Sequence, residues 1–250
     1  MHFEQRSFYS NQLEKEMPFN IYGHAGKAVL VFPSSGGSQN EYADFGMIAS
    51  CSSFIEKGLL RFYTAASYDN ESWLANNKSP HEMAEAHRRY ENYIIQELIP
   101  LITYETNSPH VIATGCSMGG FHTMNFALKH PDIFTTAIAL SGVYDIRFFT
   151  GDYYNDLAVY FNSPIDYLPS LEDPWFIDRY RQNTYITCVG QGDWELPHLL
   201  QTQNLQQIFE EKELPAWFDY WGEDSAHDWE WWSKQIAYFM NELNKQKALI

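Results

Sequence analysis

This chain of 250 residues, 45% of them hydrophobic, is long enough to bury a core without disulfides or metal ions, and its length suits a single large α/β domain. Lys and Arg number 16 against 32 Asp and Glu, so the formal net charge is −16. Nucleic acids and anionic membrane surfaces attract basic proteins. This charge therefore excludes nucleic acid as the main ligand and disfavours a membrane surface.

The cysteines and the apolar runs bear on the cellular compartment. Cys51, Cys116 and Cys188 are scattered and fit no CxxC spacing, which weakly indicates a reducing compartment. The first residues lack the apolar stretch of a secretory signal, and no run approaches the ~18 apolar residues of a membrane span. We expect a soluble, cytoplasmic protein with no cofactor and no metal. A homo-oligomer stays open.

The first half of the chain alternates between strand and helix patterns. Residues 27–32 are an apolar, β-branched run followed by a glycine-rich loop, which predicts a buried strand entering a turn. Residues 60–65 are a candidate second strand. Apolar residues at helical spacing predict a helix over 81–102, and Ser79-Pro80 is a plausible start signal for it. Residues 111–114 are a further short apolar strand.

The second half continues this alternation. We expect helices over 121–129, 198–212 and 229–245, and strands over 135–140, 185–189 and 216–221. Strands that alternate with helices in this way indicate a mostly parallel sheet with helices on both faces. The fold class is therefore α/β, in one domain over 1–250.

A long aromatic stretch interrupts the pattern between two of these strands. Long connections in compact domains are usually lids or binding loops, so we expect a cap-like insertion at about 144–182 over the carboxyl ends of the strands. The alternative is a structural excursion packed on the body of the domain. Under the first interpretation the stretch lines a small acyl or aryl pocket, and Trp175 and Trp194 contact the substrate.

One motif carries the chemistry. Gly115-Cys-Ser117-Met-Gly119 matches G-x-S-x-G, a pattern that is weak alone but is strengthened here by the strand before it and the helix after it. The turn must be sharp, and glycines at 115 and 119 remove the Cβ atoms that would obstruct it. Ser117 is the predicted nucleophile, at a helix N-terminus that favours developing negative charge. Cys116 is interpreted as a core residue.

A serine nucleophile needs a base and an acid. In α/β-hydrolases the chain order is Ser, then Asp or Glu, then His, which favours His227, in the loop after the last strand. Asp193 follows a late strand and is the predicted acid that orients the imidazole. Glu195 stands two residues on, and Asp145 follows the previous strand, where a minority of hydrolases carry the acid.

The transition state also needs two backbone donors for the oxyanion. The N–H of Met118, directly after the nucleophile, is the first. The loop Ser34-Ser35-Gly36-Gly37 supplies the second, for which we favour Ser35 over Gly36. Gly36 also stands as a predicted substrate contact.

Together these residues resemble the putative esterase family of α/β-hydrolases, which contains esterase D (S-formylglutathione hydrolase) and the mycolyltransferases. The likeness runs from about Lys27 to Phe239. Its elements are Glu97-Leu-Ile-Pro100, Gly115-Cys-Ser-Met-Gly-Gly120, His130-Pro-Asp-Ile-Phe134, Ser141-Gly142, Gly190-Gln-Gly-Asp193 and His227-Asp-Trp229. The chain departs from many relatives in the first loop, where it has Pro33-Ser34-Ser35-Gly36 in place of a His-Gly pair.

The resemblance implies a Ser117–Asp193–His227 triad and hydrolysis of an ester or thioester. We expect a serine carboxylesterase that acts on a small-molecule ester through an acyl-enzyme. An acyltransferase with the same triad is a close alternative. A binding protein on a hydrolase scaffold is a second, which an intact set of triad residues disfavours.

Overall fold

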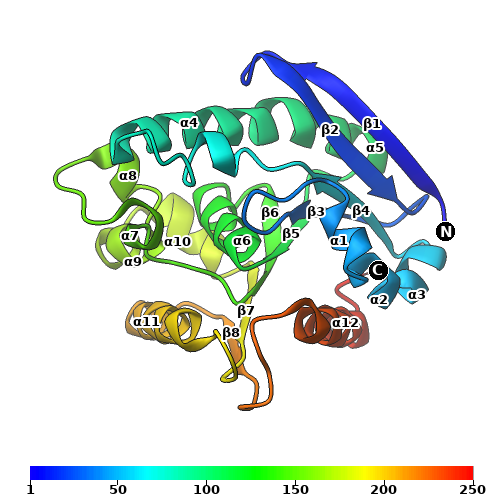
Figure 1. Ribbon diagram of the computed structural model, residues 1–250. Helices are drawn as coiled ribbons and strands as arrows, with labels where there is room; N and C mark the ends of the chain where they lie inside the picture. The colour runs from blue at the N-terminus through cyan, green and yellow to red at the C-terminus, as the bar shows by residue number, and fades with distance from the viewer. Residues whose placement is uncertain (250) are drawn as a thin grey trace.

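An eight-stranded sheet organises residues 1–249, the part of the chain that the computed structural model describes (Figure 1). The strand order is β1-β2-β4-β3-β5-β6-β7-β8, antiparallel between β1 and β2 and between β2 and β4, and parallel from β4 to β8. The strands are β1 (Phe3–Ser10), β2 (Lys15–Tyr22), β3 (Lys27–Phe32), β4 (Leu60–Ala65), β5 (Val111–Cys116), β6 (Phe134–Leu140), β7 (Thr184–Val189) and β8 (Trp217–Tyr220).

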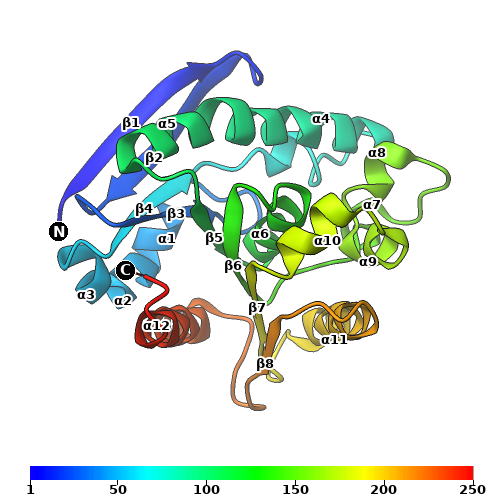
Figure 2. The same ribbon diagram turned by 180° about the vertical axis from the view of Figure 1, so that it is seen from behind.

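Helices cover both faces of this sheet (Figures 1 and 2). The α-helices are α1 (Glu41–Asp44), α2 (Met47–Ser50), α3 (Ser52–Glu56), α4 (Pro80–Tyr93), α5 (Ile99–Thr106), α6 (Met118–Lys129), α7 (Arg147–Thr150), α8 (Leu157–Tyr160), α9 (Pro164–Tyr167), α10 (Pro174–Tyr180), α11 (Leu196–Glu211) and α12 (Trp229–Lys245). Short turns of other helix types are η1 (Asp69–Glu71), η2 (Ile94–Leu98) and η3 (Leu168–Ser170). The alternation of strand and helix that the sequence predicts is thus confirmed, and the fold is α/β.

The two faces of the sheet feed two separate hydrophobic cores. Along β3, Leu30 and Phe32 pack with α4, α5, α6 and α11, whereas Val29 and Val31 pack with α1, α2, α3 and α12. Successive side chains of a strand point to opposite faces, so a strand with helices on both sides is apolar throughout. This is why 27–32 and 111–114 read as continuous apolar runs rather than alternating ones.

The helix predicted over 81–102 is three consecutive segments. Ser79 caps α4 with a reciprocal pair of hydrogen bonds to Glu82, as the start signal suggests. The π-helical turn η2 and then α5 follow, so the helical path continues to Thr106. The sequence analysis did not predict the β1–β2 hairpin, whose outer strand β1 is exposed or half-buried over most of its length, or the helices α1 to α3, which have only four or five residues each.

The aromatic stretch at 144–182 divides into two parts. In the first, Ile146 and Val159 pack beside Met118 and Phe121 at the start of α6. In the second, α9 and α10 pack at the other end of α6, where the Tyr180 hydroxyl donates to the carbonyl of Leu128. The long connection therefore runs along the flank of α6 from one end to the other. Within residues 1–249, no helix is long and apolar enough to cross a membrane.

Candidate active site

Ser117 sits at a sharp turn between β5 and α6. Its φ is 55° and its ψ is −118°, a conformation that costs a non-glycine residue energy and persists only where the surroundings enforce it. The space around the flanking glycines shows how tightly the surroundings hold this turn. A Cβ on Gly115 would lie 2.5 Å from the backbone of Gly119, and one on Gly119 would lie 2.3 Å from the carbonyl oxygen of Phe32. The strand, the turn and the end of β3 are in such close contact that only glycine fits.

His227 lies against this serine. Its Nε2 is 3.0 Å from Ser117 Oγ, and its own backbone N–H donates to the carbonyl of Asp193 at 2.9 Å. The loop between β8 and α12 carries it, as the sequence predicted. The structure therefore brings Ser117 and His227 together in hydrogen-bond contact.

The acid beside His227 is Glu195, and the prediction of Asp193 is wrong on this point. Glu195 Oε2 lies 3.2 Å from His227 Nδ1, and the Glu195 side chain is fully buried. Asp193 is exposed, and its contact with His227 is through its backbone carbonyl. Between the two acids Trp194 has a positive φ of 67°, which turns the chain so that Glu195, not Asp193, faces inward.

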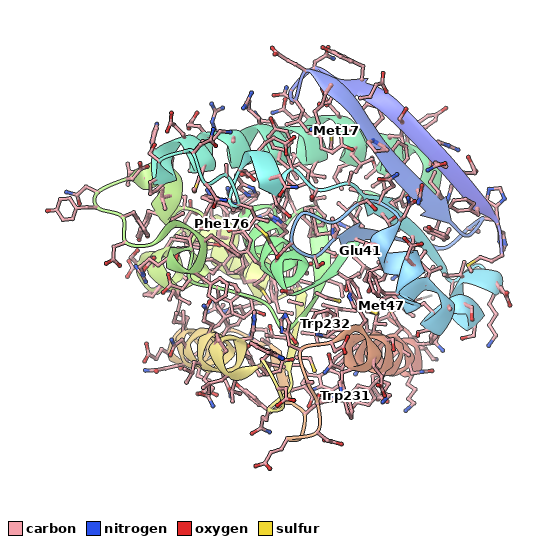
Figure 3. The ribbon with its side chains drawn as sticks, in the orientation of Figure 1. Met17, Glu41, Met47, Phe176, Trp231 and Trp232 are labelled. Atoms are coloured by element: carbon pink, nitrogen blue, oxygen red, sulfur yellow. The ribbon has the colours of Figure 1, made fainter. Side chains whose placement is uncertain are left out.

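A hydrogen-bonded chain holds the buried carboxylate of Glu195. The Ser141 hydroxyl donates to Glu195 Oε1 at 2.6 Å and accepts the indole N–H of Trp232 at 2.9 Å. The N–H of Gly190 also donates to Oε1, at 3.3 Å. Trp232 lies on the inner side of α12, while neighbouring Trp231 lies toward the periphery (Figure 3). A buried carboxylate needs such donors, because an unpaired one would be costly to desolvate. A serine after β6 and a tryptophan after the histidine were the sequence signals for this chain.

A second imidazole stacks on the first. The ring of His198, on α11, lies 4.1 Å from that of His227, and the edge-on ring of Trp232 lies 4.8 Å from His227. Burial, reinforced by the neighbouring imidazole of His227, lowers the pKa of His198 to about 4. His198 is therefore neutral at pH 7, and it packs against the His227 ring without adding a charge. The sequence analysis did not predict this contact.

The loop at 34–37 presents one free backbone donor. The N–H of Ser34 donates to Glu41 at 2.7 Å, and that of Gly36 donates to Asp69 at 3.1 Å. The N–H of Ser35 has no acceptor among residues 1–249. Met118 opens α6, and the N–H of a first helical residue has no acceptor within its helix. The N–H groups of the two predicted oxyanion donors, Ser35 and Met118, are therefore free to bind an oxyanion. The N–H of Gly36, the second choice in the loop, is already hydrogen-bonded to Asp69.

The remaining predicted contacts fare differently. Trp194 is 84% exposed and directly precedes the buried acid, so it stands at the surface beside the site. Trp175 is not brought to the site, and that prediction is corrected. It lies on α10, which is in the foreground of Figure 2, and it packs on Phe176 and Arg179. The cavity beside Phe176 has a volume of about 490 Å³ and is lined by Leu128 and residues near it, at the far end of α6.

An aromatic residue that the sequence analysis did not single out lies nearer. Phe148, on α7, places its ring 5.9 Å from that of His198 and is 51% exposed.

Burial raises the pKa of the Cys116 thiol well above its usual range, in keeping with a core residue rather than a nucleophile. Within residues 1–249 no cluster of three or more His, Cys, Asp or Glu side chains forms a metal site.

Comparison with known proteins identifies the family. A family model described as "Putative esterase" matches residues 10–242, so the chain belongs to the putative esterase family. A search of curated proteins finds no match.

Solved structures with the same fold include a ferulic acid esterase, which has 16% identity, a TM-score of 0.73 and coverage of 95% of both chains. An S-formylglutathione hydrolase from Agrobacterium tumefaciens also has 16% identity and a TM-score of 0.73, over 96% of this chain and 93% of that one. A fluorophosphonate-binding serine hydrolase of Staphylococcus aureus has 16% identity and a TM-score of 0.64, over 97% and 98%. As a member of an esterase family with this fold, the chain is an ester-hydrolysing enzyme.

The stacked imidazole leads to a prediction about stability and pH. Because the pKa of His198 is depressed to about 4 from 6.5, the unfolded chain takes up this proton more readily than the folded one. The folded state therefore loses stability as pH falls from about 6.5 to 4. His198→Phe keeps an aromatic ring and cannot take up a proton. Relative to pH 7, its free energy of unfolding should therefore rise against that of the wild type by about 3 kcal/mol at pH 4.

Denaturant unfolding of both proteins between pH 7 and pH 4 measures this difference. Burial also lowers the pKa of His87, but that residue is present in both proteins and cancels. Parallel stability curves over the whole range would contradict the assignment to His198.

Proposed function

We propose that this enzyme is a serine carboxylesterase in which Ser117, His227 and Glu195 form the catalytic triad. The observation that carries the proposal is the unbroken line of contacts from Ser117 Oγ to His227 Nε2 and from Nδ1 to Glu195, at 3.0 and 3.2 Å. A carboxylate only accepts hydrogen bonds, so Glu195 selects the tautomer with a proton on Nδ1. Nε2 is then free to accept the serine proton.

The first half of the reaction forms an acyl-enzyme. Ser117 Oγ attacks the ester carbonyl carbon as its proton moves to Nε2 of His227, and the carbonyl oxygen becomes an oxyanion. The C–O bond to the leaving alcohol then breaks, and the alcohol departs with the proton from Nε2. Glu195 stabilises the imidazolium that exists between these two steps.

The second half releases the acid. Water takes the place of the alcohol, gives a proton to His227 Nε2 and attacks the acyl carbon. The bond to Ser117 Oγ then breaks, and the serine recovers its proton. In both halves the N–H groups of Met118 and Ser35 donate to the oxyanion. Each such donor typically contributes 10²–10³-fold to kcat.

The substrate is proposed to be a small carboxylic ester or thioester. Phe148 and Trp194 are exposed aromatic side chains beside the site, and they are suited to contact the apolar part of such a molecule. An acyltransferase would use the same triad with an alcohol in place of water. A non-catalytic binding protein would have no need of a strained serine in contact with a histidine.

The first test removes the nucleophile. Ser117→Ala should abolish turnover of p-nitrophenyl esters and stoichiometric labelling by a fluorophosphonate, while thermal unfolding changes little because the side chain is small. Appreciable residual turnover in the variant would exclude Ser117. A wild type that is neither labelled nor active would favour the binding-protein alternative. Adding an alcohol and measuring the transferred ester separates transferase from hydrolase.

The second test compares the two acids. Glu195→Gln should lower kcat by about 10³–10⁴-fold, since an amide no longer fixes the tautomer or stabilises the imidazolium. Asp193→Asn should leave kcat within a few-fold, because its contact to His227 is through the backbone. If Asp193→Asn were the more damaging substitution, the assignment of the acid to Glu195 would be overturned.

The third test places the substrate pocket. Measured with acetyl to decanoyl esters, kcat/KM should change its dependence on chain length in Phe148→Ala and keep the wild-type profile in Trp175→Ala. Each methylene buried against an aromatic wall is worth up to about 0.8 kcal/mol, so loss of that wall should flatten the profile. An altered profile in Trp175→Ala alone would place the acyl group at α10.

A further inference from the structure

Two parts of the chain must be held together for the proposed oxyanion hole to exist. One donor, Ser35 N–H, is on the loop after β3, and the other, Met118 N–H, is on the first turn of α6. The end of β3 touches that turn, since the carbonyl oxygens of Phe32 and Pro33 lie 2.3 and 2.6 Å from the position of a Cβ on Gly119. Beyond this point the loop has backbone hydrogen bonds from Gly37 N–H to the Ser34 carbonyl and from Ser67 N–H to the Gly37 carbonyl, and neither of them reaches α6.

A buried pair of side chains supplies a second connection. Asp69 is fully buried on η1, and its Oδ2 accepts the N–H of Gly36 at 3.1 Å. Its Oδ1 accepts from Nε2 of His122 at 2.8 Å, and the side chains of both residues are 1% exposed. His122 lies on α6, five residues beyond the nucleophile. The pair therefore joins the residue directly after one oxyanion donor to the helix that carries the other.

Hydrogen bonds to carboxylates hold the residues on both sides of Ser35, and so they fix the orientation of its N–H group. Glu41 takes the N–H and the hydroxyl of Ser34, each at 2.7 Å, and Asp69 takes the N–H of Gly36. Gly36 has a φ of 67°, so the backbone turns between the two carboxylates. Glu41 reaches the loop from α1 (Figure 3). Ser34 and Gly36 are held by these hydrogen bonds, and Ser35 between them is the only one of the three that is exposed.

We propose that Asp69 and His122 are positioning residues for the oxyanion hole, a role that rests on the proposed esterase function. They do not contact the substrate. Asp69 fixes the Gly36 peptide, and His122 ties Asp69 to α6, so that the N–H groups of Ser35 and Met118 converge on one oxygen. Their effect is made in the transition state, where the oxyanion develops, and not in the ground state.

The experiment measures kcat, KM and the inhibition constant of a trifluoromethyl ketone in Asp69→Ala. Such a ketone adds to the serine hydroxyl and places an anionic oxygen in the hole. We expect kcat to fall by roughly 10²-fold with KM within about twofold of the wild type, and the inhibition constant to rise by the same factor as kcat/KM falls. Glu71→Gln is the matched control, a half-exposed carboxylate on the same turn whose partner is Lys15, and it should leave all three values unchanged.

A second set of variants covers the case in which Asp69→Ala fails to fold. His122→Phe keeps an aromatic ring among Phe32, Phe121 and Phe126 but leaves the Asp69 carboxylate without its donor, an unfavourable state for a buried charge. Adding Asp69→Asn removes that charge and retains an oxygen for the Gly36 N–H. The double variant should therefore recover most of the kcat and ketone affinity that His122→Phe loses.

The outcomes separate the two levels of the proposal. An active wild type with variants that lower the melting temperature but keep kcat and the inhibition constant would overturn the positioning role alone. So would a double variant no better than His122→Phe. A wild type that neither hydrolyses esters nor reacts with a fluorophosphonate would overturn the esterase proposal and the positioning role together.

Discussion

The close contact of β5, α6 and the end of β3 is the constraint on which the site depends. Gly115 and Gly119 lie so near each other and the carbonyl of Phe32 that no side chain fits between them. This proximity keeps Ser117 at a positive φ, because the chain must reverse within one residue between strand and helix. The same contact brings the loop after β3 beside the first turn of α6. This one backbone contact therefore positions the nucleophile and both candidate oxyanion donors.

Buried carboxylates perform the next level of organisation. Glu195 orients His227, Asp69 joins the Gly36 peptide to His122, and Glu41 holds Ser34. Glu195 and Asp69 are fully buried and connect segments that are more than 30 residues apart in the chain, whereas Glu41 is partly buried and binds a loop only seven residues before it. Burial raises the pKa of Glu41, and the hydrogen bonds from Ser34 oppose that shift. A chain with 32 acidic residues thus uses a few of them inside, where an unpaired charge would be costly.

The sequence predicts the parallel strands and the longer helices, because those strands are mainly apolar on both faces and those helices are rich in apolar residues, whereas the β1–β2 hairpin and the short helices α1 to α3 carry no such signal. It also predicts the Ser117–His227 contact, since the glycine spacing and the position after the last strand are local or topological signals. The acid was missed by two residues. Asp193 and Glu195 both follow β7, and which of them faces inward is decided by the positive φ of Trp194. Bulky residues such as tryptophan rarely adopt a positive φ, so the residue types at this turn did not indicate a left-handed backbone there.

The aromatic connection shows the other limit of sequence reasoning. Its density of rings suggested a cover over the nucleophile, yet Tyr144, Tyr167 and Tyr180 are core residues packed along α6 and beneath it. Aromatic side chains bury large areas, so they serve an irregular segment that must hold on to a helix flank as well as they serve a pocket. Sequence alone cannot say which end of a helix of 12 residues, about 18 Å long, each ring reaches. Phe148 lies beside the imidazole of His198, whereas Trp175 packs on Phe176 and Arg179 on α10, which is why the proposed acyl pocket is assigned to α7 and not to α10.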